Sequence, residues 1–389
     1  MRRQFLLPQG TNAFALPLLQ ARALRAFADG FVAVLLPVYL LALGFGTWEV
    51  GLLATTTLFG SALATLAVGA WGHRFHHSTL LSFAALLMAA TGIAFAASSA
   101  FWPLLIVAFV GTLNPSSGDV SLFLPLEHAR LAQAADGDVR TSLFARYSLI
   151  GSLFAAFGSL ASGVPVYLGL WSAISSLDAL RVMFVLYGLI GASVWLLYRG
   201  LPKPQVHESK SAAARLGPSR AIVVRLAALF SVDSFAGGLV VNSLLALWLF
   251  KRFDMSLTAA GAFFFWSGLC SAASQLAAPW LARRIGLLNT MVFTHIPASL
   301  CLIVAAFTAD LAVTLVLLIV RSLLSQMDVP ARGAFVMAVV RPEERAAAAS
   351  FTAVPRSLAS AAGPTIGGAL FSVGLLAAPL VACGVLKIA

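Results

Sequence analysis

Charged residues are scarce in this chain of 389 residues. It contains 25 Lys and Arg and 14 Asp and Glu, whereas 60% of its residues are hydrophobic. Soluble domains usually carry about 25% charged residues, and a soluble core of this length could not bury so much apolar surface. The composition therefore predicts an all-α integral membrane protein, because helices satisfy their own backbone hydrogen bonds where water is absent.

Cysteine is scarce as well, and its placement excludes two kinds of structural site. Cys270, Cys301 and Cys383 are odd in number, far apart and set among apolar neighbours, which predicts packing residues rather than a disulfide framework or a zinc site. Residues 73–77 hold three histidines at a metal-like spacing. This short basic loop nevertheless favours contact with lipid headgroups. We therefore expect no metal and no cofactor.

The motifs of catalysis are missing. The chain has no nucleophile elbow, no glycine loop of the Walker type, no paired-histidine zinc helix and no appended soluble domain. Its net charge of +11 is spread between apolar stretches and does not form a basic face or tail. We expect neither an enzyme nor an ATP-driven pump, and no nucleic acid as a partner.

Apolar stretches long enough to cross a bilayer repeat along the chain. A spanning helix needs about 20 mostly apolar residues. The predicted spans are 21–43, 48–71, 78–98, 101–126, 142–167, 179–198, 221–250, 256–281, 287–308, 311–339, 346–372 and 374–389. We expect two six-helix bundles, residues 1–198 and 221–389, joined by a linker at 199–220 that is rich in Pro, Ser and basic residues. The last span is short or truncated, because Lys387 lies inside it.

Lys and Arg are concentrated in alternate loops. This bias predicts that the amino terminus and the linker are cytoplasmic. Arginine greatly outnumbers lysine, a habit typical of GC-rich bacteria. We expect a multi-pass protein of the bacterial cytoplasmic (inner) membrane, monomeric and surrounded by lipid.

The two halves of the chain match each other at their rare charged residues. A shift of roughly 204 to 210 residues superimposes Asp29 on Asp233 and Arg146 on Arg356. The same shift superimposes Asp119 on Asp328. Charged residues are too few for this agreement to be casual, so the halves are interpreted as copies of one six-helix unit.

Six plus six spans around a basic middle loop resemble the major facilitator superfamily of secondary transporters. The family's motif between its second and third helices corresponds to residues 69–77, where Gly69 and Arg74 match, and to 279–286 in the second half, which keeps Arg284. The resemblance implies a gating role for Arg74 and Arg284. The stretch "GPTIGG" at 363–368 resembles the family's antiporter motif, although it falls in the eleventh span rather than the fifth.

The resemblance also implies that spans one, four, seven and ten line a central cavity. Each of these spans carries one aspartate: Asp29, Asp119, Asp233 and Asp328. An ionised carboxylate in the hydrocarbon region costs about 3 kcal/mol, so each must face protein or water. Arg146 and Arg356 are their expected partners, either as buried ion pairs that fix helix register or as substrate contacts. We expect Asp29 and Asp119 to cluster with Arg146, and Asp233 and Asp328 with Arg356.

The tenth span places several polar residues in an apolar segment. Spacings of four, three and four put Arg321, Ser325, Asp328 and Arg332 on one face of a helix. Pro330 predicts a kink in that helix. Arg321 lies nearest the membrane midplane and is a candidate for binding an anionic or polar group of the substrate, the alternative being an interhelical hydrogen-bond donor.

Other polar residues of these spans are weaker candidates. Pro115 predicts a break in the fourth span that corresponds to the kink at Pro330, and we expect both prolines to take part in gating. The amides of Asn114 and Gln326 could bind substrate or make packing bonds between helices. Glu127 and Glu344 lie beside basic residues and are interpreted as members of loop salt bridges.

These observations together predict a secondary active transporter that moves a small molecule by alternating access. An Asp that loses and regains its Arg partner would take up and release a proton, which predicts coupling to a proton gradient. Export of a drug or metabolite is the favoured direction. Import of a small polar metabolite, or a membrane receptor that no longer transports, are the alternatives.

Overall fold

The computed structural model describes residues 7–116, 121–171, 174–202, 217–341 and 344–389. Within these ranges it leaves undescribed the side chains of His73, Asp138, Pro330, Arg345, Ala346, Ala347 and Ser350. The secondary structure of the described residues is entirely helical, which confirms the predicted all-α fold. Asp119, one of the predicted site residues, lies outside the described residues.

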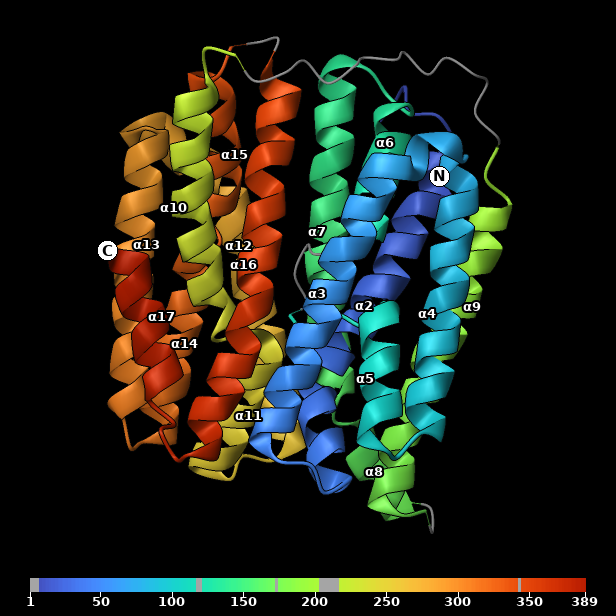
Figure 1. Ribbon diagram of the computed structural model, residues 1–389, viewed down its shortest axis with the longest axis vertical. Coiled ribbons are helices and arrows are strands. Elements are labelled where there is room, and N and C mark those ends of the chain that lie inside the picture. The colour runs from blue at the N-terminus through green and yellow to red at the C-terminus, as the bar shows by residue number, and fades with distance from the viewer. Residues whose placement is uncertain (1–6, 117–120, 172–173, 203–216, 342–343) are drawn as a thin grey trace. The chain divides into compact units, whose positions relative to one another are not determined.

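Nine helices precede the central polar stretch in the described part of the chain (Figure 1). They are α2 (Ala15–Ala42), α3 (Thr47–Trp71), the short 3₁₀ helix η1 (Gly72–Arg74), α4 (His77–Ala97), α5 (Phe101–Val110), α6 (Phe123–Ala132), α7 (Gly137–Ala161), α8 (Val164–Trp171) and α9 (Ser176–Arg199). The helices after that stretch are α10 (Arg220–Gly238), α11 (Asn242–Phe253), α12 (Leu257–Ile285), α13 (Leu287–Phe307), α14 (Leu311–Ser325), α15 (Asp328–Val339), α16 (Arg345–Ser372) and α17 (Ala378–Ile388).

Eight helical segments among the described residues are long and apolar enough to cross a membrane, and three shorter apolar helices accompany them. The protein is therefore a multi-pass membrane protein. Four of the predicted spans are interrupted. The span expected at 142–167 is divided into α7 and α8, and the span expected at 221–250 into α10 and α11. The span expected at 101–126 begins as α5, which ends at Val110, and the span expected at 311–339 is divided into α14 and α15. The break predicted at Pro115 is confirmed, because residues 111–116 are not helical.

The break between α14 and α15 changes the interpretation of the tenth span. The structure ends α14 at Ser325 and starts α15 at Asp328, so Arg321 and Arg332 lie on different helices. The spacing predicts one continuous helix that carries these side chains on one face, and the structure does not form that single helix. Pro330 is the third residue of α15, where a proline is tolerated because the first-turn amides of a helix have no intrahelical acceptor.

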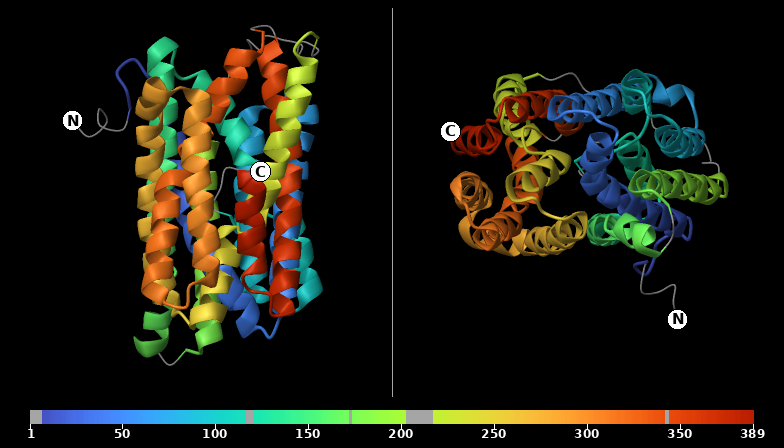
Figure 2. Two further views of the ribbon diagram at one scale, coloured as in Figure 1. Left: turned by 90° about the vertical axis from the view of Figure 1, so that its left-hand side faces the viewer. Right: turned by 90° about the horizontal axis from the view of Figure 1, so that it is seen from below.

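The helices pack into two compact units. The first consists of the described residues of Met1–Phe45, Thr56–Val206 and Ser256–Phe265, and the second of those of Gly46–Thr55, His207–Met255 and Trp266–Ala389. In the first unit α2 packs along α7 and α4 along α9. In the second unit α10 packs along α16 and α13 along α17, which are the corresponding helices of the repeat. Figure 2 shows these pairs nearly end on. The predicted duplication is thus visible in equivalent helix pairs.

Small residues let the backbones of these pairs approach closely. A Cβ atom on Gly158 of α7 would lie 1.9 Å from the carbonyl oxygen of Phe27 in α2. A Cβ atom on Gly363 of α16 would lie 2.2 Å from the carbonyl carbon of Gly238 in α10. No side chain fits at either place, as is typical where membrane helices associate without a hydrophobic driving force between them.

Two short segments belong to the unit against which they pack, and not to the unit that contains most of their own half of the chain. Residues 46–55, at the start of α3, belong to the second unit, where the amide of Thr365 donates to Oγ1 of Thr55 at 2.9 Å. Residues 256–265, at the start of α12, belong to the first unit, where a Cβ atom on Gly261 would lie 2.7 Å from the carbonyl oxygen of Ser159. Helices α3 and α12 are therefore each divided between the two units.

Candidate functional site

Four helices of the second unit bring five ionisable side chains together. Asp233 lies on α10, His295 on α13, Asp328 and Arg332 on the first turns of α15, and Lys387 on the last turn of α17. We call these five residues the charge cluster. Each of its helices is otherwise largely apolar, so the polar side chains gather where they can satisfy one another.

Asp233 is the centre of the charge cluster. Its Oδ1 lies 2.7 Å from Nζ of Lys387 and 3.0 Å from Nε2 of His295. Its Oδ2 lies 3.2 Å from a terminal nitrogen of Arg332. The same nitrogen of Arg332 pairs closely with Oδ2 of Asp328, one helical turn earlier on α15. Two carboxylates and two cations therefore compensate each other, which the low dielectric of a membrane interior requires.

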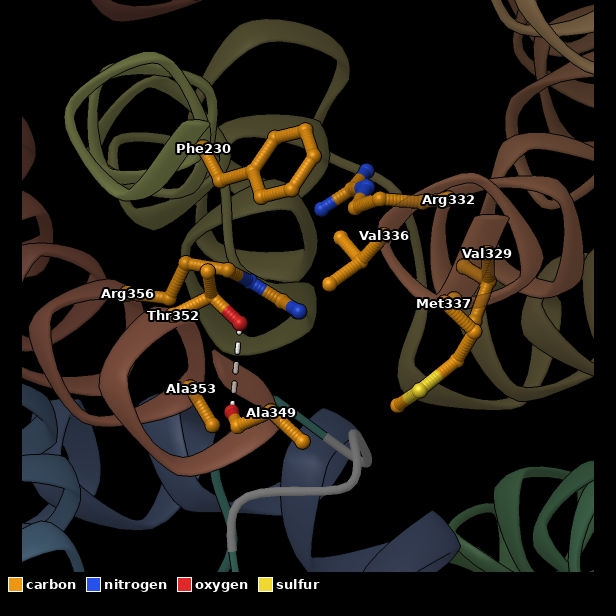
Figure 3. Close-up of a pocket in the computed structure, with 10 residues that line it drawn as sticks. Phe230, Val329, Arg332, Val336, Met337, Ala349, Thr352, Ala353 and Arg356 are labelled. Atoms are coloured by element: carbon orange, nitrogen blue, oxygen red, sulfur yellow. Dashed lines mark hydrogen bonds between the residues drawn. The ribbon is translucent and has the colours of Figure 1, made fainter. Parts of the chain in front are cut away.

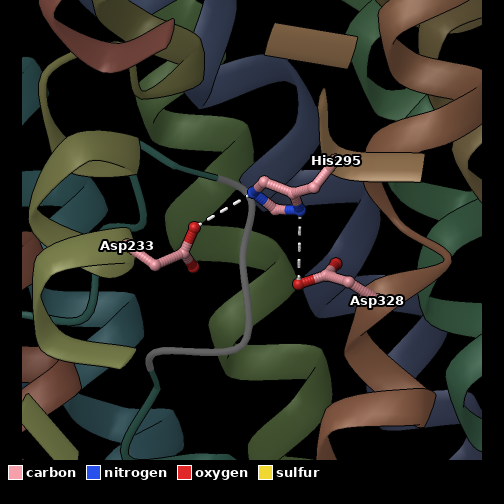
Figure 4. Close-up of side chains that lie close together, drawn as sticks. All are labelled: Asp233, His295 and Asp328. Carbon is pink, nitrogen blue, oxygen red and sulfur yellow. Dashed lines mark hydrogen bonds and ion pairs between the residues drawn. The ribbon is translucent and has the colours of Figure 1, made fainter. Parts of the chain in front are cut away.

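The hydrogen bonds of His295 depend on which of its ring nitrogens carries a proton. Its Nε2 lies within hydrogen-bonding distance of an acceptor, Oδ1 of Asp233, and of a donor, Nζ of Lys387 at 3.2 Å. Its Nδ1 faces Oδ2 of Asp328 at 3.8 Å (Figure 4). A protonated Nε2 donates to Asp233, whereas an unprotonated Nε2 accepts from Lys387. One proton on the ring therefore decides which of the two contacts is favourable.

A cavity of about 190 Å³ lies beside the charge cluster, between α10, α15 and α16. Arg332 lines it, and so does Arg356 of α16, whose Nε donates to Oγ of Ser234 at 3.2 Å. Figure 3 shows Arg356 reaching toward Val336 and Arg332, with the ring of Phe230 next to them. Arg332 thus belongs both to the charge cluster and to the cavity wall.

Asp233, His295 and Asp328 also have the ligand types that bind metal ions. Their ligand atoms all lie within 4.8 Å of one another. Arg332 and Lys387 already compensate the two carboxylates, however, so a divalent cation would have to displace both side chains. The ion pairs already present therefore disfavour a resident metal.

The first unit contains a different buried group. Arg25 of α2 pairs closely with Glu127 of α6, and the hydroxyls of Tyr147 in α7 and Tyr198 in α9 donate to the same carboxylate. The side chain of Glu127 is fully buried. The prediction that Glu127 belongs to a loop salt bridge is therefore wrong: it joins four helices inside the unit.

The predicted site residues of the first unit are not all gathered at this group. Asp29 is buried on α2, one helical turn after Arg25. Arg146 is half-buried on α7. Asn114 is buried beyond the end of α5, where its Oδ1 accepts hydrogen bonds from the amide and hydroxyl of Ser116 at 3.2 and 2.7 Å. These local bonds place Asn114 in a turn.

In the second unit Asp233 and Asp328, which were predicted to cluster, do lie together, and Arg332 pairs with both of them. Arg321 is half-buried on α14 and makes no hydrogen bond or ion pair with any described residue. Gln326 directly follows α14 as its C-cap residue.

The residues assigned to gating lie at helix ends. Arg74 is exposed at the end of η1. Arg284 is in the last turn of α12, and its guanidinium carbon lies 4.5 Å from the ring centre of Trp280. Pro115 is buried in the break after α5, and Pro330 is in the first turn of α15.

Sequence reasoning missed two members of the charge cluster, His295 and Lys387. Both carry a signal that could have found them, because an ionisable residue inside a membrane span has to find a partner. His295 is the sole histidine in the apolar helix Leu287–Phe307, and Lys387 is the sole charged residue of Ala378–Ile388. In the sequence Lys387 indicates a short last span, whereas in the structure its Nζ pairs with Asp233.

Comparisons with known proteins agree with this architecture. The sequence model of the Major Facilitator Superfamily matches residues 18–364. An uncharacterised membrane protein of Saccharomyces cerevisiae is 23% identical over 388 residues, covering 89% of this chain and 85% of the yeast protein. The nucleoside transporter NupG has a similar fold, with a TM-score of 0.73 at 14% identity, covering 97% of this chain and 96% of NupG.

A second solved structure has the same fold. The human organic anion transporter MFSD10 gives a TM-score of 0.68 at 18% identity, covering 96% of this chain and 97% of MFSD10. Since the family model spans most of the sequence, the predicted resemblance is confirmed. The chain belongs to the Major Facilitator Superfamily, and it is a membrane transporter of that family rather than an enzyme.

Proposed function

We propose that the protein moves a small molecule across the membrane by alternating access and couples this movement to protons at the charge cluster. One observation carries the coupling: Nε2 of His295 lies within hydrogen-bonding distance of both Asp233 and Lys387. Either ring nitrogen of a histidine can donate or accept a hydrogen bond, depending on which nitrogen carries a proton. The ring can therefore alternate between two sets of partners without leaving its place.

The charge cluster also gives a physical reason for linking this proton to a conformational change. A carboxylate that loses its cation inside a membrane protein is costly to keep ionised. If Lys387 or Arg332 moves away from Asp233, a proton on His295 or on Asp233 replaces the lost positive charge. Proton uptake then accompanies one arrangement of these helices and proton release the other.

The direction of transport stays a prediction. The motif at residues 363–368 favours export, and import is the alternative. Helix packing accounts for two glycines of that motif, because Gly363 lies against Gly238 and Gly368 against Gly51. The sign of proton movement in the assay below tests the direction independently of the motif.

Three probes represent three classes of cargo. NupG is a nucleoside transporter and MFSD10 an organic anion transporter, so uridine and benzoate are the first two. Mn²⁺ is the third, because Asp233, His295 and Asp328 offer metal-ligand atoms. Each probe is added to proteoliposomes that contain the full chain and a fluorescent pH indicator, and the internal pH is followed.

We expect one of the three probes to cause proton movement. Asp233→Asn and His295→Gln should each reduce that proton movement at least about tenfold, because each variant removes a side chain with which the exchanged proton interacts. Asp254→Asn is the matched control, since Asp254 is an exposed carboxylate at the end of α11, in a left-handed conformation that asparagine also adopts. A proton signal that survives in both cluster variants would contradict the proposed coupling.

A further inference from the structure

We infer that the cavity between α10, α15 and α16 binds a small organic anion, with Arg356 and Arg332 holding its acidic group. This inference deepens the proposed function and rests on it for the meaning of the site in transport. Three properties of the cavity support it: the charge of its lining, its volume and the hydrogen bonds of Arg332.

The chemistry of the wall selects an anion. The described residues that line the cavity include two arginines and no carboxylate. Arg356 comes from α16 and Arg332 from α15, so guanidinium groups approach the space from two walls (Figure 3). Guanidinium groups present planar sets of donors that match the two oxygens of a carboxylate. Among the described lining residues a cationic molecule would meet two guanidinium groups and no carboxylate.

The rest of the wall selects an apolar body for that anion. Apart from Arg332, Arg356, Gly333 and Thr352, the lining consists of apolar side chains: Phe230, Val329, Val336, Met337, Ala349 and Ala353. The Thr352 hydroxyl already donates to the carbonyl oxygens of Ala348 and Ala349. An inorganic anion would leave this apolar surface uncovered, whereas a carboxylate with a ring or short chain would cover it.

The size of the cavity limits the ligand. Pockets for drug-sized molecules usually measure about 300 to 1,000 Å³, and this one measures about 190 Å³. A molecule with one ring, such as benzoate, is therefore a better probe than a molecule with several rings. The cavity favours a metabolite over the drug that the sequence analysis gave as one possible cargo.

Arg332 has donors left for a ligand. Its Nε is buried and has no hydrogen-bond partner among the described residues. One of its terminal nitrogens pairs with the carboxylates of Asp233 and Asp328. Its guanidinium carbon lies 5.3 Å from the ring centre of Phe230. An anion in the cavity would give the unpaired donor a partner and would share Arg332 with the carboxylates of the charge cluster.

Binding of benzoate to the purified full-length protein in detergent tests this inference directly. The compounds compared are benzoate and benzamide, which have the same shape but differ in charge. We expect benzoate to raise the thermal unfolding temperature in a concentration-dependent way, and benzamide to raise it far less, because a bound ligand stabilises the folded state by mass action. Isothermal titration gives the dissociation constants.

The variant Arg356→Gln should weaken benzoate binding about tenfold or more, since it removes a charge-assisted hydrogen bond. Arg356→Lys keeps the charge without the planar donor set and should fall between the two. Arg252→Gln is the matched control, because Arg252 is exposed on α11 and does not line the cavity. Near-native unfolding temperatures without ligand show that the variants are folded.

The outcomes separate this inference from the proposed function. Benzamide binding as tightly as benzoate, or Arg356→Gln and Arg356→Lys binding benzoate like the parent protein, would overturn the anion site. Proton-coupled movement of uridine or Mn²⁺ without benzoate binding would overturn it too, while leaving the coupling intact. Benzoate binding that depends on Arg356 without any proton movement would keep the site and reject the coupling.

Discussion

Arg25 of α2 pairs with Glu127 of α6 where water does not reach either side chain, since the exposed fractions are 2% and 0%. Two tyrosine hydroxyls complete the carboxylate's hydrogen bonds, Tyr147 from α7 and Tyr198 from α9. The group therefore connects four helices of the first unit through one carboxylate. The charge cluster of the second unit has different members, although Asp29 and Asp233 are matched across the repeat.

Breaking this pair from one side should be costly. Glu127→Gln leaves Arg25 charged and buried without its anion, for which we expect a loss of about 3 to 5 kcal/mol in the free energy of unfolding. Denaturant unfolding of the detergent-solubilised protein measures it. The double variant Arg25→Met with Glu127→Met should lose less than Glu127→Gln alone, because no unpaired charge remains.

An exposed ion pair is the control for that experiment. Arg140 and Asp136 pair at 2.9 Å on the surface of the first unit, and such pairs contribute about 0 to 1 kcal/mol. Arg140→Gln should therefore change the unfolding free energy little. A cost for Glu127→Gln no larger than for Arg140→Gln would show that the buried group does not hold the four helices together.

Close helix packing predicts opposite effects of two glycine substitutions. Gly158→Ala would place Cβ 1.9 Å from the Phe27 carbonyl oxygen, so α2 and α7 must separate. We expect a loss of about 1 to 3 kcal/mol, as for other overpacked sites. Gly169→Ala in α8 meets nothing within 4 Å and should gain up to about 1 kcal/mol through helix propensity. Thermal unfolding of both variants checks the signs, and two shifts of the same direction would contradict the packing argument.

A loop contact predicts part of the pH dependence of stability. Glu344 accepts hydrogen bonds from the amides of Gly217 and Ser219 at 2.9 and 3.1 Å. Hydrogen bonding from Ser219, followed by that from Gly217, lowers the pKa of Glu344 below its ordinary value. Because the folded pKa lies below the unfolded one, the contribution of Glu344 is fully present above the unfolded pKa and is lost as the pH falls through the folded pKa.

We therefore expect the unfolding temperature of the parent protein to fall in mildly acidic solution more steeply than that of Glu344→Gln. Asp136→Asn, which removes an exposed carboxylate, should follow the parent curve. Thermal scans between neutral and acidic pH compare the three proteins. Parallel curves for the parent and Glu344→Gln would exclude this contribution.

The charge cluster and the cavity predict that anion and proton bind together. His295 faces Asp233 of α10, Asp328 of α15 and Lys387 of α17, and Arg332 connects these groups to the cavity. A proton on His295 adds positive charge next to the cavity and favours an anion there, and by reciprocity an anion favours the proton. Benzoate binding should thus take up protons from the buffer.

Titration of benzoate in buffers with different ionisation enthalpies measures this uptake. We expect a net uptake near neutral pH that disappears in His295→Gln, with benzoate binding itself weakened but still present. A binding enthalpy that is the same in all buffers would mean that anion and proton bind independently.

The sequence predicts the architecture well because membrane spans depend on local composition. Apolar length places the passes, and the match of Asp29 with Asp233 reveals the duplication. Breaks at Pro115 and near Pro330 also follow from local rules, although the second falls at Gln326 and Met327 rather than at the proline. Each of these features needs only a short stretch of chain.

The charge cluster is harder to predict because its members come from four helices. The depth of Asp233 and Asp328 in their spans indicates that they meet, but the rotation of α15 about its axis decides that Arg332 joins them. Helix rotation is set by packing against neighbouring helices. The sequence shows which ionisable side chains lie inside membrane spans and therefore need partners. Which partners they contact depends on how the helices pack.

The ion pair of Asp233 with Lys387 has a consequence for how the protein is made. The two residues are 154 positions apart, and chains are synthesised from the amino terminus. Asp233 therefore enters the bilayer with α10 well before α17 exists. His295 emerges next, then Asp328 with Arg332, and Lys387 last. The newly inserted helix must carry an incompletely neutralised carboxylate during translation, and arrival of the final helix completes its neutralisation.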